Sequence, residues 1–387
     1  MFKIRKVEFI NHPILGGLTL DFCDASGHAV DTVIFAGENG VGKSTILNAL
    51  YELSANNTET ELNLEIERTE GIEVLQYRRD ERNNLIYVFD STKSGYYIGS
   101  DDFKRTYNFH GIFSDVDINF HSNDLSNVTS LALDQKIESR RSSNNLPTEI
   151  KQLLIDIQAL DDADIAYWVK HNFGVNTDKM VISERIPRFT KAFAGMFDNL
   201  EYDRIENVDG HKEILFSKGG HNIPIDALSS GEKQIVYRGC FLLKDANAMN
   251  GAFVFIDEPE ISLHPKWQMK VMDYYKGIFT DESGKQTSQI FAVTHSPFII
   301  HNENRKNDKV IVLARDSNGK IVVKDKPAYY KCSSVEAVQD AFEIHDFDSG
   351  NPTVYLEGRT DEKYFRKTAE IFDMDLPFQF RWIGYMD

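Results

Sequence analysis

The feature that most constrains this chain is a glycine-rich loop between an expected buried strand and an expected helix. Residues 31–36 (DTVIFA) form an apolar run of strand type, and residues 45–53 have the apolar spacing of a helix. Between them, residues 37–45 (GENGVGKST) fit the pattern G-x-x-x-x-G-K-[ST]. Glycines in such a loop let backbone N–H groups turn toward phosphate oxygens, and the helix N-terminus adds partial positive charge. The sequence therefore predicts a phosphate-binding loop.

The loop also predicts roles for single side chains. Lys43 is expected to neutralise the β- and γ-phosphates of a nucleotide and to act in catalysis, and the Ser44 hydroxyl is expected to ligate Mg²⁺. ATP and Mg²⁺ are therefore the predicted cofactors. The predicted cofactor-binding residues of the loop are Gly37, Asn39, Gly40, Gly42, Lys43, Ser44 and Thr45.

A second apolar run ends in a pair of acids. Residues 253–256 (FVFI) are followed directly by Asp257 and Glu258. A buried strand of this kind places Asp257 at its tip, beside the phosphate loop, where it can hold Mg²⁺ through water. Glu258 is then positioned to orient the attacking water, so we predict it as a catalytic residue. The alternative is that the two acids only begin a turn.

Residues 228–234 (LSSGEKQ) resemble the signature sequence of ABC-type ATPases. A serine hydroxyl and a glycine N–H at a helix start form a further anion site, although the same four residues also make an ordinary capping box. In the ABC family the signature reaches the γ-phosphate held by the opposite subunit. The resemblance therefore implies a dimer that encloses two ATP molecules, with contacts from Ser229, Ser230, Gly231 and Glu232.

Two further stretches support this resemblance. His295, in residues 294–297 (THSP), resembles the switch histidine that senses the γ-phosphate, so we predict it as a catalytic residue. Residues 260–265 (EISLHP) occupy the position of the loop that crosses the dimer interface, and they depart from the Ala-Leu-Asp pattern of transporter subunits. A transporter ATPase is therefore disfavoured. The Q-loop glutamine stays unassigned between Gln76 and Gln135.

The last part of the sequence carries a motif of a different kind from the ATPase motifs. Residues 354–365 (VYLEGRTDEKYF) resemble the opening of a Toprim domain, and an ABC ATPase followed by Toprim is the layout of the overcoming-lysogenisation-defect (OLD) family of ATPase–nucleases. The resemblance implies that Glu357 and Asp361 ligate Mg²⁺ for phosphodiester cleavage in anti-phage defence. Two carboxylates at a strand tip and a helix start can converge on one hard cation. Alternatively, Asp361 is only an N-cap, and the Glu-Gly pair only a turn.

The Toprim resemblance covers only the first part of such a domain. After Glu357 the sequence predicts one helix and one strand, and its Asp-x-Asp, Asp373 to Asp375, comes too early for the family's second acidic motif. A parallel sheet of this type needs further strands. We therefore expect these residues to be part of a longer protein that hydrolyses ATP, with endonuclease activity only in the full-length protein.

The predicted fold class is α/β, an ABC-type P-loop ATPase head with a mixed sheet and an antiparallel β lobe. Residues 1–119 are expected to form the first part of the head, 120–198 a helical insertion or arm, 199–330 the second part, and 331–387 a linker and an incomplete Toprim-like segment. Residues 2–10 and 16–22 alternate like the two strands of a hairpin, and a period-two pattern from about 61 to 120 predicts an antiparallel sheet. Helices are expected around residues 150–160, 165–169 and 183–197. The insertion lacks sustained heptads, which counts against an SMC-like DNA-repair ATPase.

The charge of the chain limits its partners. Its formal net charge is −17, so contact with DNA or another nucleic acid requires a local basic patch. The other expected partners are a second copy, as a homodimer or higher homo-oligomer, and a separate defence-system protein, if a degenerate Toprim recruits an effector. No apolar run approaches the length of a membrane span, and residues 1–9 lack a signal-peptide core. We therefore expect a cytoplasmic protein without membrane contact. The candidate basic pairs are Lys104–Arg105, Arg140–Arg141 and Arg305–Lys306.

Overall fold

The structure of the chain is a computed structural model. It describes residues 2–91, 95–115, 146–175, 185–245, 248, 250–281, 283–301, 308–324, 353–356, 358–372, 374, 376 and 378–382. The chain divides into two compact units, Met1–Ser334 and Val335–Asp387. The phosphate loop, the acid pair and the signature lie in the first unit, and the Toprim-like stretch lies in the second.

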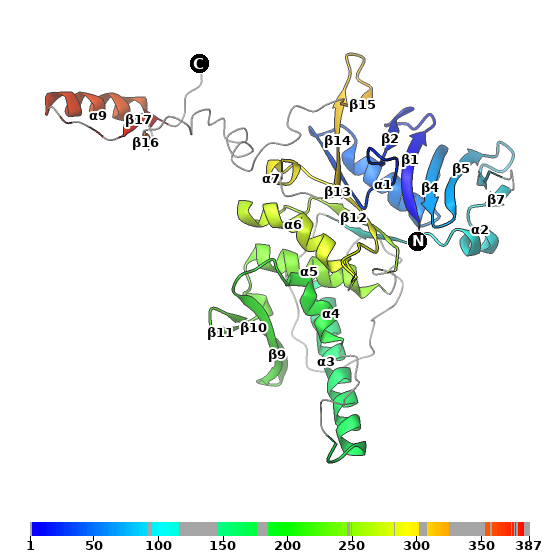
Figure 1. Cartoon of the computed structure of the whole chain (residues 1–387), viewed down its shortest axis with the longest axis horizontal. Helices are drawn as coiled ribbons and strands as arrows, with labels where there is room; N and C mark the ends of the chain where they lie inside the picture. The colour runs from blue at the N-terminus through cyan, green and yellow to red at the C-terminus, as the bar shows by residue number, and fades with distance from the viewer. Residues whose placement is uncertain are drawn as a thin grey trace. The chain divides into compact units, whose positions relative to one another are not determined.

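A six-stranded sheet forms the centre of the first unit, in the order β15-β14-β3-β13-β12-β8 (Figure 1). All neighbouring strands are parallel except β14 and β15. Since β13 lies between β3 and β12, the loops that follow these three strands meet at one edge of the sheet. The strands are β3 (Thr32–Gly37), β8 (Gly111–Ser114), β12 (Phe253–Asp257), β13 (Gln289–Val293), β14 (Asp308–Arg315) and β15 (Ile321–Val323).

Alternate residues of the central strands enter two separate cores. On β3, Ile34 packs with α5 (Ser230–Lys244) and α6 (Pro265–Ile278), whereas Phe35 packs with α1 (Lys43–Ser54). The same alternation holds along β12 and β13. Successive side chains of a strand point to opposite faces, so a strand covered on both faces is apolar throughout. This is the pattern of the strands that carry the site.

An antiparallel sheet covers the α1 side of the first unit, in the order β2-β1-β4-β5-β6-β7. It confirms the predicted N-terminal hairpin and the antiparallel lobe that begins near residue 61. The expectation that this lobe continues to residue 120 is wrong, because α2 follows β7 and then β8 joins the central sheet. All four residues of β8 are buried, as in a strand covered on both faces. The elements are β1 (Lys3–Phe9), β2 (Thr19–Asp21), β4 (Leu62–Arg68), β5 (Gly71–Arg79), β6 (Ile86–Phe89), β7 (Gly95–Tyr97) and α2 (Asp101–Thr106).

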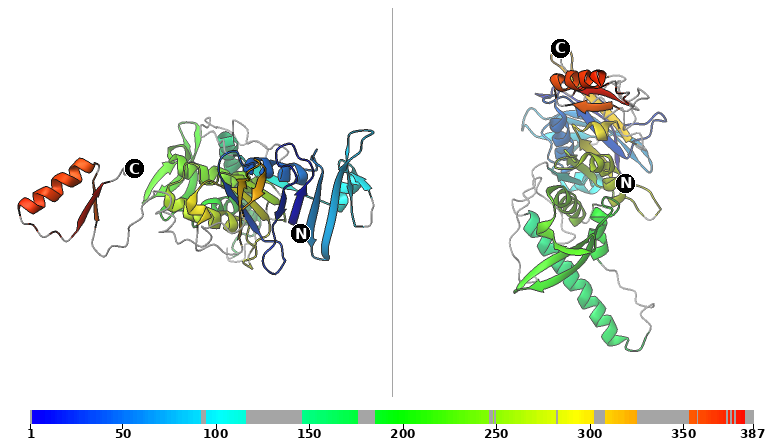
Figure 2. Two further views of the ribbon diagram at one scale, coloured as in Figure 1. Left: turned by 90° about the horizontal axis from the view of Figure 1, so that it is seen from above. Right: turned by 90° about the vertical axis from the view of Figure 1, so that its left-hand side faces the viewer.

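The helical region differs from its prediction. A single helix, α3 (Leu146–His171), replaces the two helices expected at residues 150–160 and 165–169, because no proline or glycine interrupts residues 148–171. Its first half is buried against α5 through Ile150, Leu154 and neighbouring residues. Its second half is largely exposed and extends from the body (Figures 1 and 2). A short helix and a 3₁₀ turn, α4 (Ile186–Thr190) and η2 (Lys191–Phe193), occupy part of the third expected helix.

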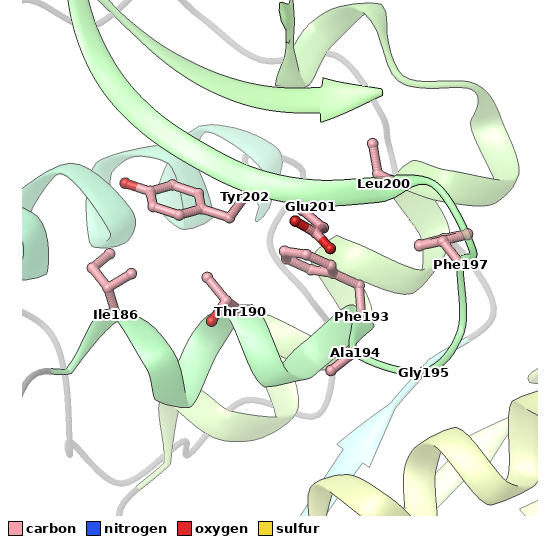
Figure 3. Close-up of a pocket in the computed structure, with 9 residues that line it drawn as sticks. All are labelled: Ile186, Thr190, Phe193, Ala194, Gly195, Phe197, Leu200, Glu201 and Tyr202. Atoms are coloured by element: carbon pink, nitrogen blue, oxygen red, sulfur yellow. The ribbon is translucent and has the colours of Figure 1, made fainter. Parts of the chain in front are cut away.

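A three-stranded antiparallel sheet, in the order β11-β10-β9, follows η2. A cavity of about 400 Å³ lies between α4, η2 and the start of β9 (Figure 3). One residue that lines it, Phe197, packs edge-on against Trp267 of α6, with ring centroids 5.0 Å apart. The Phe197 side chain thus separates the cavity from Trp267 of α6. The elements of this region are β9 (Leu200–Val208), β10 (His211–Lys218), β11 (His221–Pro224) and η3 (Ile225–Ala227), and α7 (Pro297–Ile300) follows β13.

The second unit contains β16 (Thr353–Leu356), α9 (Arg359–Ile371) and β17 (Gln379–Trp382). The two strands are parallel, with Thr353 opposite Gln379. This confirms the strand, helix and strand predicted from the sequence, with a helix start two residues before Asp361. Among the described residues, no helix combines the length and apolarity that a membrane span requires.

Close packing between α5 and η2 predicts a matched pair of stability effects. A Cβ at Gly239 on α5 would lie 2.6 Å from Ala192 Cβ and against the Tyr274 hydroxyl. We expect Gly239→Ala to lower the free energy of unfolding by about 1–3 kcal/mol, because the clash forces α5 away from its neighbours. The urea midpoint of unfolding measures this.

The matched control is Gly277→Ala on α6, where a Cβ would meet no atom within 4 Å. We expect this variant to be neutral or more stable by up to about 1 kcal/mol, because alanine favours helix. Equal midpoints for the two variants would contradict the packing described for α5.

Candidate functional site

The loop after β3 has the backbone conformation that its glycines allow. Gly37, Gly40 and Gly42 have φ angles of 141°, 78° and 84°, in a region that side chains disfavour. A Cβ at Gly37 would collide with the carbonyl of Leu313, and one at Gly42 would lie 2.8 Å from Ile321 Cδ1. Neighbouring β14 and β15 therefore leave no room for a side chain. Asn39, Gly40 and Ser44 are exposed on this loop, and Thr45 is half-buried.

Lys43 lies inside the loop. Its Nζ donates hydrogen bonds of 2.8 Å to the carbonyl oxygens of Gly37 and Glu38, and its side chain is buried. Burial lowers the pKa of Lys43, while the nearby charges of Asp257 and Glu258 act in the opposite direction. The loop thus holds a desolvated ammonium opposite a pair of acids, a suitable position for contact with a polyphosphate.

Asp257 ends β12 and is 7% exposed. Its carboxylate is hydrogen-bonded to the Ser44 hydroxyl, and its buried Oδ1 has no hydrogen-bond partner among the described residues. Burial, with a further contribution from the charge of Glu258, raises the pKa of Asp257 to about 6. A hydroxyl beside a carboxylate oxygen without a donor is a set of hard oxygen ligands. These residues fit a divalent cation such as Mg²⁺.

Glu258 and His295 face each other at the same edge of the sheet. Glu258 Oε1 lies 3.8 Å from His295 Nε2, and the two side chains are 35% and 38% exposed. The N–H of Glu258 donates to the carbonyl of Val293 at the end of β13, at 3.0 Å. Glu258 has a φ angle of 44°, a left-handed conformation that is uncommon for a residue with a side chain. Adjacent strands thus fix both groups at the edge of the sheet that also carries the phosphate loop.

Glu260 is a functional candidate that sequence reasoning missed. Its Oε1 accepts hydrogen bonds from the N–H groups of His295 and Ser296, at 2.7 and 3.1 Å. Burial raises its pKa. Glu260 therefore fixes the main chain that carries His295. Its signal in the sequence is an acidic residue two positions after Glu258. From the sequence, this residue is assigned only to the loop expected to cross the dimer interface.

The signature turn begins α5 and forms a capping box. Glu232 accepts from the N–H and the hydroxyl of Ser229, at 2.9 and 2.8 Å, and its other oxygen pairs with Lys218. Glu232 is 3% exposed, and its carboxylate is occupied by Ser229 and Lys218. A nucleotide contact from this turn therefore has to come from residues other than Glu232. Ser229 and Ser230 are exposed. The Ser230 hydroxyl makes no hydrogen bond with any described residue.

Gly231 joins the signature turn to the loop after the acids. A Cβ at this position would lie 2.8 Å from the carbonyl oxygen of Ser262 and 3.0 Å from the Trp267 ring. Only glycine lets the two segments approach this closely. The turn and the Ser262 loop therefore form one packed surface, with Trp267 beneath it.

The structure does not bring every predicted residue to the site. Gln76 is exposed on β5 in the antiparallel sheet, so it does not lie at the edge that carries Lys43 and Asp257, and Gln135 lies outside the described residues. In the second unit, Asp361 is exposed in the first turn of α9, whose N-cap is Gly358 rather than Asp361. Glu357 lies outside the described residues. Among the residues that are described, no group of three or more His, Cys, Asp or Glu side chains is arranged to hold a metal ion.

The raised pKa of Asp257 predicts a cost to stability. Because the folded-state pKa, about 6, exceeds the ordinary value of 3.8, the folded protein pays for an ionised Asp257 as the pH rises through this range. We expect Asp257→Asn to raise the free energy of unfolding at pH 7, on the order of 2 kcal/mol. The gain should shrink as the pH falls toward 5.

Urea midpoints of both proteins from pH 5 to pH 8 measure this difference. Asp273→Asn serves as a control, because the Asp273 side chain is 58% exposed and should show no such gain. A loss of stability in Asp257→Asn at pH 7 would show that the ionised carboxylate is well compensated.

Comparisons with known proteins agree with this geometry. A family model described as "AAA domain, putative AbiEii toxin, Type IV TA system" matches residues 33–301. The retron Vc95 probable ATPase of Vibrio cholerae is 24% identical over 252 residues, 59% of this chain and 44% of that protein. The Septu protein PtuA of Bacillus thuringiensis is 24% identical over 212 residues, 52% of this chain and 48% of that protein. The chain thus spans less than half the length of these relatives.

A solved structure shows the same fold. The SMC head bound to the C-terminal winged-helix domain of ScpA superimposes with a TM-score of 0.51 at 15% identity, over 83% of this chain and 97% of that one. The likeness establishes an SMC-head-like P-loop ATPase fold with mixed sheets. The family model covers well over half of the chain. The chain therefore belongs to the family of AAA-domain proteins that this model describes.

Proposed function

We propose that this protein is an ABC-type ATP hydrolase that dimerises around ATP. The observation that carries the proposal is the convergence of Lys43, the Ser44–Asp257 pair and the Glu258–His295 pair at one edge of the sheet. Such an arrangement can bind a polyphosphate, hold a cation and place a base beside the terminal phosphate.

Each residue has a distinct part in the proposed reaction. Lys43 contacts the β- and γ-phosphates, and its charge offsets the negative charge that develops there. Ser44 and Asp257 hold Mg²⁺, which when bound neutralises phosphate charge. Glu258 orients the attacking water and accepts its proton, and His295 donates a hydrogen bond to the γ-phosphate.

The signature turn supplies the reason for a dimer. Ser229, Ser230 and Gly231 lie at the start of α5, where the helix N-terminus and the Ser230 hydroxyl favour an anion. Ser230 is exposed and makes no hydrogen bond with a described residue, which supports a contact with nucleotide held by a second copy. In the proposed complex each subunit's turn completes the other subunit's site.

We further propose that the second unit begins a Toprim domain and that ATP-driven dimerisation controls its metal-dependent nuclease in anti-phage defence. The parallel pairing of β16 and β17 around α9 supports this, as does the similarity of the chain to a retron ATPase and a Septu protein. Glu357 and Asp361 would then bind Mg²⁺. In this scheme residues 1–119 and 199–330 form the head, 120–198 the insertion and 331–387 the start of the nuclease.

The second candidate is an ATP switch whose second unit recruits a separate effector protein. The outer surface of α9 favours it, because Tyr364, Ile371 and Phe372 are 68%, 68% and 71% exposed. Apolar side chains that gather on one short unit mark a surface that another protein or domain covers.

The dimer predicts a trapped state. Glu258→Gln should bind Mg²⁺ and ATP but lack the carboxylate that activates water, so we expect the variant to sediment as a dimer under saturating ATP and as a monomer without nucleotide. Analytical ultracentrifugation measures this. The control is the double variant Glu258→Gln with Ser230→Arg, which should remain a monomer; a monomeric Glu258→Gln with ATP bound would rule out the sandwich.

The Toprim assignment predicts a metal site apart from the ATP site. In an Asp257→Asn background, we expect Mn²⁺ titration to show a remaining site whose affinity falls about tenfold or more in Asp361→Asn, since each ligand carboxylate contributes strongly. Glu370→Gln is the control, because Glu370 is exposed and paired with Lys367. If Asp257→Asn alone abolishes Mn²⁺ binding, the Toprim assignment is contradicted, and the result favours the candidate in which the second unit recruits a separate effector protein.

A further inference from the structure

Arg238 is a fully buried arginine in the signature helix α5. It lies two turns after the signature turn, on the side of the helix that faces the central sheet. One terminal nitrogen donates to the carbonyl oxygen of Glu258 at 3.2 Å, and the other donates to the carbonyl oxygen of Asp115 at 2.7 Å. A single guanidinium thus links α5 to the ends of two adjacent strands, β12 and β8.

The first of these contacts reaches the main chain of the proposed catalytic base. Glu258 has a left-handed backbone, with a φ angle of 44°. Its N–H is held by Val293 on one side and its carbonyl by Arg238 on the other. Residues in such a conformation cost about 1–3 kcal/mol and persist only where the surroundings fix them. The Glu258 carbonyl also accepts from the N–H of Ile261 at 3.2 Å, so Arg238 is one of three described hydrogen-bond partners of the Glu258 peptide groups and the one that comes from a side chain.

The surroundings of Arg238 argue against a purely structural role. Among the described residues it forms no ion pair with a carboxylate, although its charge acts to lower the pKa of Asp257, and its Nε has no hydrogen-bond partner. Gln234, one turn earlier on α5, is also fully buried, and neither of its amide atoms has a hydrogen-bond partner in the described part of the chain. A buried charge without a carboxylate partner is costly, and an apolar side chain of similar volume often stabilises such a site. Stability alone does not explain this arginine.

We propose that Arg238 is a positioning residue for ATP hydrolysis, which holds the main chain of Glu258 in place and ties it to the helix that begins with the signature turn. The inference rests on the proposed function and goes beyond it. Because Arg238 lies on the same helix two turns after Ser229 and Ser230, a shift of that turn moves Arg238, and with it the Glu258 carbonyl. Contact of the turn with nucleotide on a second subunit would thereby adjust the base in its own subunit.

The test exploits the planar fork of arginine, which a lysine cannot reproduce. In the full chain, Arg238→Lys keeps the charge but can reach only one of the two carbonyl oxygens. We expect kcat for ATP to fall about ten- to 100-fold, because the base is misplaced, while KM for ATP stays within about threefold of the wild type. Binding of a fluorescent ATP analogue, which involves Lys43 and Ser44, should be unchanged.

A matched control contacts the other end of the same helix. Arg188 of α4 also donates to two main-chain carbonyls, those of Leu243 and Asp245 at the C-terminus of α5, in this case from one terminal nitrogen. Arg188→Lys should lower the melting temperature about as much as Arg238→Lys but leave kcat near the wild-type value. A loss of kcat in Arg238→Lys that exceeds the loss in Arg188→Lys at similar stability separates positioning from general destabilisation.

The outcomes distinguish this inference from the proposed function. If the wild type hydrolyses ATP and Glu258→Gln does not, but Arg238→Lys retains full kcat, the inference is overturned and the proposed function stands. A rise in KM that accounts for the whole loss in Arg238→Lys also overturns the inference, because it indicates weaker binding rather than a displaced base. Absence of ATP turnover in the wild type would overturn both.

Discussion

The structure depends on the order of three parallel strands, in which β13 lies between β3 and β12. Hydrogen bonds between parallel strands fix the register, so the phosphate loop, the acid pair and the histidine must leave the sheet at the same edge. Apolar side chains on both faces hold these strands between two cores. The sheet, rather than the loops, thus sets the geometry of the site. Functional groups are held in position more precisely on rigid strands and helices than on loops.

A second constraint is the concentration of charge that this order creates. Asp257, Glu258 and Glu260 lie close together around the ammonium of Lys43. Burial raises the pKa of Asp257 and of Glu260 and lowers that of Lys43, so the protein without ligands maintains each ion at a cost. A bound polyphosphate and cation supply the charges that these groups lack. The proposed reaction therefore begins from a site that is electrostatically prepared for its ligands.

Local sequence patterns predicted the parts of the site that depend on neighbouring residues. The phosphate loop, β12 with Asp257 at its tip, and β13 before His295 follow from short motifs and uniform apolarity, and the structure contains all three elements as expected. The predicted roles of these residues in catalysis remain proposals. The parallel pairing of β8 and the continuity of α3 were missed, because both depend on burial against distant segments rather than on local composition.

The residues that sequence reasoning missed act over long separations and through main-chain atoms. Arg238 bonds the carbonyls of Glu258 and Asp115, which are 20 and 123 residues away. Glu260 bonds an N–H 35 residues away. A sequence motif does not reveal such contacts, because the second residue contributes a main-chain atom rather than its side chain. A lone arginine in the apolar stretch QIVYRGCFLL was the visible signal.

The left-handed backbone at Glu258 bears on which amino acids this position accepts. Glycine would adopt a φ angle of 44° without penalty, and asparagine or aspartate would adopt it more readily than glutamate. Conformational preference and chemical need thus point to different residues at one position. Selection for folding alone would favour glycine or asparagine at this position. The glutamate therefore lowers stability in exchange for a carboxylate on a longer side chain beside His295.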